Sequence, residues 1–228
     1  MATHVERVVA YGDSLMLGLG TPTRHGWVHM LRQHYYEELN ADVGTTRHPP
    51  IFYEIGAFAT NAADLAAAVI GPETKQRFRI YGEKDGYDPT KRLSIVSVGV
   101  NDSYLLTEEG EHATPLEDFQ RDIGTIATAL AAQSQILYVG LLPCHEELRR
   151  EFWDIKNTLP QLRSRELYEE TAIDTFAAAG AQTIPATAQA ANSAIYMNNI
   201  SEDGIHGGVP SEQKVYEWVV RRFDDMVA

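Results

Sequence analysis

Residues 5–15 of the chain read Val-Glu-Arg-Val-Val-Ala-Tyr-Gly-Asp-Ser-Leu, and the fold can be worked out from this stretch. Its first part, Val5 to Tyr11, is a short run rich in β-branched residues, which predicts a buried β-strand. The next residues, Gly12-Asp13-Ser14, favour a tight turn directly after that strand. The stretch therefore predicts a buried strand whose carboxyl end carries a hydroxyl group.

Predicted strands and helices alternate along the rest of the chain. Short apolar runs predict four more strands, and apolar residues at helical spacing predict the helices between them. The predicted strands are 51–55, 93–100, 135–142 and 181–185, and the predicted helices are 26–39, 61–70, 114–130, 162–179 and 211–227. Such alternation is typical of a parallel sheet that helices cover on both faces. We therefore expect an α/β fold, a three-layer α/β/α sandwich with a flavodoxin-like sheet of about five parallel strands. We also expect a single domain over residues 1–228.

Two connecting segments carry local predictions. Thr114 can cap the helix that follows it, Pro115 suits the first helical position, and Glu117 can close a capping box. The polar segment 75–92 contains two glycines and a proline, which favours irregular structure. This segment could shape a pocket, form an oligomer contact or have no specific role, and the sequence predicts no oligomeric state.

The charge of the chain excludes some partners. There are 19 Lys and Arg against 32 Asp and Glu, which gives a formal net charge of −13. Such a surface repels nucleic-acid phosphates and anionic lipid head groups, so we expect no nucleic-acid partner. No stretch approaches the ~20 apolar residues that a membrane span needs, so we expect no stable membrane insertion.

Cysteine content and the N-terminal residues bear on the compartment. The single cysteine, Cys144, cannot form an internal disulfide. The first residues lack the basic and apolar regions of a signal peptide, which predicts a cytoplasmic protein. A secreted chain whose leader had been removed would look the same. Cys144 follows a predicted strand, and we interpret it as a small packed residue rather than a catalytic thiol.

Residues with chemical potential follow the predicted strands. Ser14 follows the first strand, Gly56 the second and Asn101 the third, while Asp203 and His206 lie in a loop before the last helix. Ligands of open α/β sheets bind beyond the carboxyl ends of the strands, so these residues are expected to meet at one edge. Taken singly, each has an ordinary structural explanation as a turn, a cap or a surface residue.

Together, the five residues suit acyl transfer. A serine hydroxyl becomes a good nucleophile when a neighbouring imidazole takes its proton, which is the role open to Ser14 and His206. Asp203 can fold back to the other ring nitrogen and fix the tautomer. The Ser14 N–H, the Gly56 N–H and the Asn101 side chain could stabilise an oxyanion. Asp13 and Asp102 are interpreted as bracing the turns.

Competing motifs are incomplete. Residues 95–99 lack the first glycine of a Gly-x-Ser-x-Gly elbow, and Thr23 stands where a dinucleotide motif needs its third glycine. Residues 145–149 lack the second histidine of a zinc protease helix. We therefore expect no cofactor and no metal.

The sequence resembles the SGNH hydrolase superfamily, also called the GDSL esterases and lipases. The resemblance rests on four blocks in the family's order: Val8 to Leu15, Glu54 to Thr60, Gly99 to Asp102, and Asp203 to His206. It implies a catalytic triad of Ser14, Asp203 and His206, with Ser14, Gly56 and Asn101 forming the oxyanion hole.

The second block departs from the family pattern. The family commonly has an Asn before the glycine of this block, whereas this chain has Glu54-Ile55 there, and Ala59 stands where the family has a later glycine. Gly56 is therefore the least well supported of the assigned residues.

The resemblance implies a serine hydrolase of carboxylic esters that works through an acyl-enzyme on a small or lipid-like acyl ester. An acyltransferase, an acyl thioesterase or a sugar O-deacetylase could use the same triad, and a non-catalytic binding protein could have the same fold. Met16, Leu17 and Leu19 could form an apolar rim beside Ser14 or belong to the core. Other candidate pocket residues are Phe58, Tyr104 and Trp153.

Overall fold

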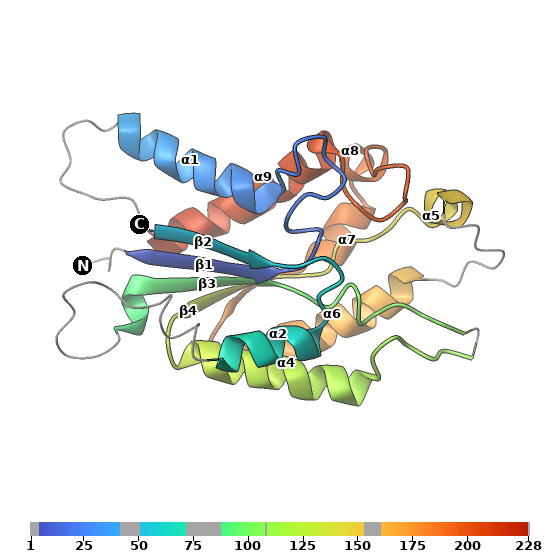
Figure 1. The fold of residues 1–228 in the computed structure, drawn as a ribbon, viewed down its shortest axis with the longest axis horizontal. Coiled ribbons are helices and arrows are strands. Elements are labelled where there is room, and N and C mark those ends of the chain that lie inside the picture. Colours follow the sequence, from blue (N-terminus) through green and yellow to red (C-terminus); the bar gives the residue numbers. More distant parts are fainter. Residues whose placement is uncertain (1–4, 42–50, 72–87, 108, 153–160, 228) are drawn as a thin grey trace.

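The strand that begins the chain lies inside a parallel five-stranded sheet (Figure 1). The computed structural model describes residues 5–41, 51–71, 88–107, 109–152 and 161–227. The strands are β1 (Arg7–Gly12), β2 (Ile51–Gly56), β3 (Arg92–Ser97), β4 (Gln135–Val139) and β5 (Gln182–Ile184). Their order in the sheet is β2-β1-β3-β4-β5, and every neighbouring pair is parallel.

Burial of the strands explains their composition. All six residues of β1 and all six of β3 are buried, because these strands have a neighbour on each side and helices above and below. Strands buried on both faces are expected to be continuous apolar runs, which is how the sequence of β1 reads. The edge strand β2 is buried at Phe52 alone and is exposed at both ends.

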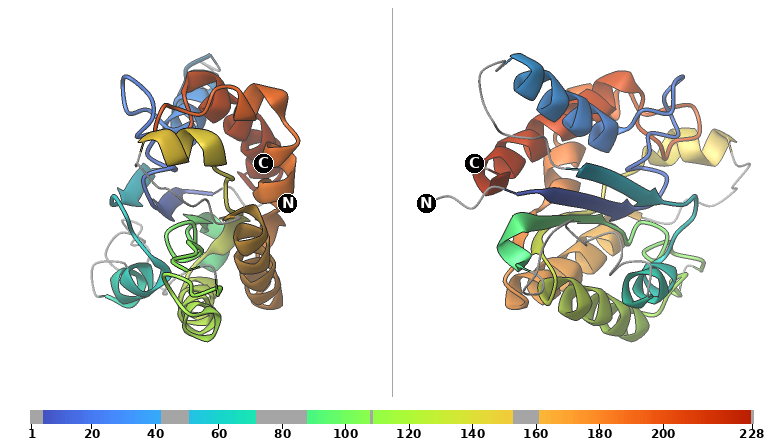
Figure 2. Two further views of the ribbon diagram at one scale, coloured as in Figure 1. Left: turned by 90° about the vertical axis from the view of Figure 1, so that its right-hand side faces the viewer. Right: turned by 60° about the vertical axis from the view of Figure 1, so that its left-hand side comes forward.

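Helices cover both faces of the sheet, which confirms the predicted three-layer sandwich. On one face lie α1 (Trp27–Ala41) and α9 (Val209–Val227), with α8 (Ala194–Met197) against α9 (Figures 1 and 2). On the other face lie α2 (Ala62–Ile70), α4 (Leu116–Ala131) and α6 (Gln161–Ala178). The short helix α7 (Ala186–Ala191) contacts both α6 and α8.

Some local predictions differ from the structure. Helix α4 begins at Leu116 with Pro115 at its cap position, and no side chain caps it. The Thr114 hydroxyl donates instead to Asp102, at 2.8 Å, so the predicted capping box is wrong. A tertiary hydrogen bond has taken the hydroxyl that would otherwise cap the helix.

The structure adds four elements and leaves one segment untested. The sequence did not predict the helices α5 (Glu146–Phe152), α7 and α8 or the short helix η1 (Pro89–Lys91). Most of the polar segment 75–92 lies outside the described residues, and so does Trp153. Within the described ranges, no helix combines the length and apolar character that crossing a membrane requires.

The strand order locates the site before any side chain is considered. The chain passes from β1 to β2 on one side and then returns to place β3 on the other side of β1. The direction of winding therefore reverses between β1 and β3. Doubly wound sheets bind ligands at such a switch point, beyond the carboxyl ends of the strands.

Candidate active site

Ser14 lies in the turn that follows β1. The Asp13 carboxylate accepts the Leu15 N–H at 2.9 Å, and the Leu19 N–H donates to the Ser14 carbonyl oxygen at 3.2 Å. These local bonds hold the turn, as expected of an Asp in a short strand-to-turn connection. The Ser14 side chain is thereby fixed at the carboxyl edge of the sheet.

A separate loop presents Asp203 and His206. One carboxylate oxygen of Asp203 accepts three bonds: from the Ser201 hydroxyl at 2.6 Å, the Ile205 N–H at 2.8 Å and the His206 N–H at 3.0 Å. Its other oxygen lies 2.5 Å from His206 Nδ1. The three-residue spacing lets one carboxylate close the loop and orient the imidazole at the same time.

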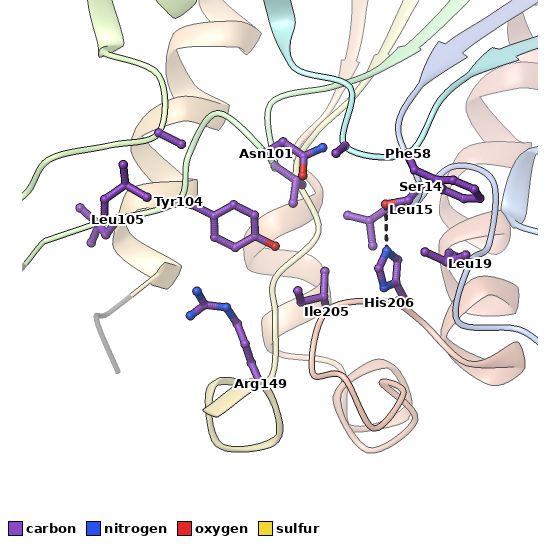
Figure 3. Close-up of a pocket in the computed structure, with 14 residues that line it drawn as sticks. Ser14, Leu15, Leu19, Phe58, Asn101, Tyr104, Leu105, Arg149, Ile205 and His206 are labelled. Carbon is purple, nitrogen blue, oxygen red and sulfur yellow. Dashed lines mark hydrogen bonds between the residues drawn. The ribbon is translucent and has the colours of Figure 1, made fainter. Parts of the chain in front are cut away.

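The two segments meet across 192 residues of sequence (Figure 3). His206 Nε2 lies 2.8 Å from Ser14 Oγ, and both residues are buried. The structure thus brings Ser14, His206 and Asp203 into one hydrogen-bonded line. In this line the imidazole can accept the serine proton while the carboxylate holds the opposite ring nitrogen.

Hydrogen bonding keeps Asp203 ionised. Burial by itself disfavours the charged carboxylate, but the bonds from His206, Ser201 and the loop amides hold the pKa of Asp203 well below its usual range. An ionised Asp203 can stabilise the imidazolium that forms when His206 takes a proton.

Ser14 and His206 open into a cavity of about 640 Å³. Most of the described residues that line it are apolar. They are Ser14, Leu15, Leu19, Phe58, Ala59, Val100, Asn101, Tyr104, Leu105, Leu106, Ala113, Arg149, Ile205 and His206. Phe58, Tyr104 and Leu19 thus line the pocket as the sequence suggested, whereas Met16 is fully buried in the core.

Asn101 reaches this pocket from the end of β3. One hydrogen of its side-chain amide donates to the Thr60 carbonyl oxygen at 2.9 Å, which fixes the orientation of the amide. The structure therefore brings Asn101 to the same cavity as Ser14 and His206.

Gly56 is not brought to the pocket. It ends β2 beside Gly12 of β1, and a side chain there would point at Leu17 and Met16. The pocket is lined from this connection by Phe58 and Ala59, and Ala59 has a φ of 59°, in the left-handed region. The sequence did contain a signal for Ala59, because Ala59 stands where the second block of the family commonly has its later glycine.

The remaining acidic candidates have structural roles. Asp102 accepts the Ala62 N–H at the start of α2 and the Thr114 hydroxyl, so it ties three segments together. Burial raises the pKa of Asp13 to about 6, although the Leu15 N–H and the charges of His206 and Arg165 lower it. Cys144 is buried and is not among the residues that line the pocket.

Glu212 is a buried acid that sequence reasoning missed. Its carboxyl group is 1% exposed and accepts the N–H of Trp27, the first residue of α1, at 2.9 Å. Burial raises the pKa of Glu212 to about 8, despite the opposing effect of the Trp27 N–H. Because Glu212 lies in the first turn of α9, it ties the start of α9 to the start of α1.

Replacing Glu212 with glutamine should stabilise the protein increasingly as the pH rises. The folded protein keeps the proton on Glu212 up to about pH 8, whereas an unfolded chain releases it near pH 4.5. Glu212 therefore lowers stability progressively between these values, and glutamine removes this effect while its carbonyl still accepts the Trp27 N–H. Urea unfolding at pH 6 and pH 9 should show that the free energy of unfolding of the variant exceeds that of the wild type. The difference should be larger at pH 9, where it should reach a few kcal/mol, on the order expected for a pKa shift of this size. An increase in the free energy of unfolding that is the same at both pH values would contradict a raised pKa of Glu212 in the folded protein.

The fold is similar to that of solved lipolytic hydrolases, among them a member of the G-D-S-L family. Neither a protein-family model nor a curated protein matches the sequence. Solved structures at 13–14% identity do match over nearly the whole chain.

A lipase/acylhydrolase from Enterococcus faecalis is 14% identical, with 96% of each chain covered and a TM-score of 0.66. The acetyl xylan esterase AlAXEase is 13% identical, with 95% of this chain and 98% of that chain covered and a TM-score of 0.65. A member of the lipolytic protein G-D-S-L family from Veillonella parvula is 14% identical, with 96% of each chain covered and a TM-score of 0.56. These likenesses confirm the predicted resemblance at the level of the fold.

Proposed function

We propose that this protein is a serine hydrolase of carboxylic esters that works through an acyl-enzyme. The observation that carries the proposal is the hydrogen-bonded line from Ser14 Oγ to His206 Nε2, at 2.8 Å, and from His206 Nδ1 to Asp203, at 2.5 Å. Ser14 and His206 line a mostly apolar cavity, which supports a substrate with an acyl group.

In the first half of the reaction, Ser14 Oγ attacks the ester carbonyl carbon while its proton passes to His206 Nε2. The carbonyl oxygen becomes an oxyanion, and the ionised Asp203 stabilises the imidazolium. When the tetrahedral intermediate collapses, the bond to the leaving alcohol breaks and His206 gives that alcohol its proton. Water then attacks the acyl-enzyme by the same steps and releases the carboxylic acid.

The oxyanion donors we propose are the Ser14 N–H, the Asn101 side-chain amide and the Ala59 N–H. Ala59 takes the place that the sequence had assigned to Gly56, because Ala59 lines the pocket with Ser14 and Asn101. The left-handed conformation of Ala59 is unusual for a residue with a side chain, and such conformations concentrate at functional sites.

Alternatives within the same chemistry differ in the acceptor or in the acyl group. An acyltransferase would replace water by an alcohol, and a thioesterase or a sugar O-deacetylase would use the same three residues. The apolar lining of the cavity favours an acyl chain over a sugar. The proposed reaction needs no metal or cofactor, and the cytoplasmic location stays a prediction.

The direct experiment is a chain-length series of p-nitrophenyl esters, assayed beside acetylated sugars and acyl thioesters. We expect turnover of the p-nitrophenyl esters and covalent labelling of Ser14 by a fluorophosphonate. Absence of both turnover and labelling in the folded protein would overturn the proposal and favour a non-catalytic binding protein.

Replacing Asn101 with alanine should lower kcat by about 10²- to 10³-fold with little change in KM, since an oxyanion donor acts mainly in the transition state. Asn192→Ala is a matched control: its amide also donates to a backbone carbonyl, but at the exposed C-terminal end of α7. This control should keep full activity. Equal losses in the two variants would mean that the Asn101 amide has no special role.

A further inference from the structure

Arg149 is the one guanidinium group among the described residues that line the pocket. The same residues include no Asp and no Glu. This contrasts with the chain as a whole, where acidic residues outnumber basic ones and the net charge is −13. A positive group in an apolar pocket of an acidic protein is a feature that packing alone does not explain.

The loop that carries His206 also positions Arg149. The His145 N–H donates to the Gly204 carbonyl oxygen at 2.8 Å, just before α5 begins. Gly204 has a φ of +72°, and a side chain at this position would collide with the Arg149 backbone. Gly204 therefore lets α5 pack directly on the loop between Asp203 and His206, and α5 carries Arg149 to the cavity.

The Arg149 side chain extends from α5 toward the Tyr104 ring (Figure 3). Its guanidinium carbon lies 5.1 Å from the centre of that ring, within the range of a cation–π contact. The ring contact orients the guanidinium group, and none of its N–H groups donates a hydrogen bond to another described residue. Across the described part of the chain, no carboxylate forms an ion pair with Arg149.

A second guanidinium group lies near the same ring. The Arg165 guanidinium carbon is 5.6 Å from the centre of the Tyr104 ring, and Arg165 is fully buried. Arg165 donates to the Leu142 carbonyl oxygen, but its Nε and Nη2 find no acceptor among the described residues. Two guanidinium groups thus lie close to the Tyr104 ring, although the charge of Arg165 also interacts with that of Asp13.

We propose that the natural substrate is an ester that carries an anionic group, a carboxylate or a phosphate, separated from the ester carbonyl by an apolar segment. This inference rests on the proposed function, because Ser14 must hold the ester end. The apolar side chains of the pocket cover the connecting segment, and Arg149 binds the anion through paired N–H donors, as guanidinium groups do. The substrate class is then amphiphilic anionic esters and not acyl esters in general.

The test compares esters that differ only in charge. One pair is the mono-p-nitrophenyl ester of suberic acid and the same compound with its free carboxyl group methylated, so that length is matched. A second pair places the carboxylate on the alcohol: an acetate ester of an ω-hydroxy acid and the acetate of the matching alkanol. For the wild type, we expect kcat/KM to favour the anionic member of at least one pair by about tenfold or more.

Replacing Arg149 with methionine should abolish that preference. We expect kcat/KM for the anionic ester to fall about 10- to 100-fold and kcat/KM for its neutral partner to change less than about threefold. Arg149→Lys should keep part of the preference, because it keeps the charge but loses the paired donors. Arg150→Met is the matched control, since it removes the same charge from an exposed position of α5 outside the pocket lining.

The outcomes separate the two proposals. If the wild type hydrolyses the neutral and anionic esters equally well, or if Arg149→Met weakens both members of each pair alike, the anionic substrate is overturned while the esterase activity stands. If the wild type hydrolyses none of the four compounds and resists fluorophosphonate labelling, the proposed function fails and this inference fails with it.

Discussion

Replacing Ser14 with alanine will lower kcat for p-nitrophenyl esters by roughly 10⁴- to 10⁶-fold, the range expected when a triad nucleophile is removed. The physical reason is that no other hydroxyl among the described pocket residues is hydrogen-bonded to the His206 imidazole. The loss should appear in kcat, because the cavity that binds the acyl chain is unchanged. Single-turnover assays and fluorophosphonate labelling measure it directly.

The fold should survive this change. Alanine removes one side-chain hydrogen bond from Ser14, worth about 1 kcal/mol, and leaves the Asp13 and Leu19 bonds of the turn in place. Ser193→Ala is the matched control, since Ser193 caps the distant helix α8, and it should keep full activity. Substantial turnover by a purified, folded Ser14→Ala protein would show that another residue is the nucleophile.

Replacing Asp203 with asparagine should cost about 10³- to 10⁴-fold in kcat. The asparagine carbonyl can still accept the N–H groups of Ile205 and His206, so the loop keeps its shape. Its NH₂ group then faces His206 Nδ1, which favours the tautomer with the proton on Nε2. That nitrogen can no longer accept the Ser14 proton, so the loss comes from proton transfer and not from misfolding.

A neighbouring variant separates the two tasks of Asp203. Ser201→Ala removes one of the three bonds to the loop-closing carboxylate oxygen and leaves the contact with Nδ1 intact. We expect its kcat to fall less than about tenfold, since the bond to Nδ1 is what sets the tautomer. If Asp203→Asn also lost less than tenfold, a different group would have to orient His206.

Several parts of the candidate site follow from local sequence. A strand followed by Gly12-Asp13-Ser14 favours a tight turn at the edge of the sheet, and Asp203, three residues before His206, can fold back to the imidazole in a short turn. Asn101 comes shortly after a buried strand, so its position at the carboxyl edge of the sheet can be predicted in the same way. These are short-range relations, set by chain geometry and residue type, so they can be predicted without knowing what packs around them.

Other parts depend on contacts that sequence spacing does not contain. Ala59 and not Gly56 lines the pocket, because the path of the chain after β2 decides which residue reaches the cavity. Arg149 reaches the pocket because α5 packs on Gly204, which is 55 positions further along the printed sequence. Glu212 was missed because an acidic residue at the start of a helix ordinarily faces solvent, and its burial follows from the packing of α9 on α1.

The sequence by itself determined the class of fold, the order of strands and helices, and the residue types available at each strand end, because these depend on apolar periodicity and turn chemistry along a few neighbouring residues. Only the tertiary structure decided which of those residues share one cavity and what charge that cavity carries. The strand order β2-β1-β3-β4-β5 puts the end of β1 beside the end of β3, and the packing of α9 on α1 brings the loop before α9 to Ser14. Such long-range proximity arises from burying many side chains at once, and no single stretch of the chain encodes it.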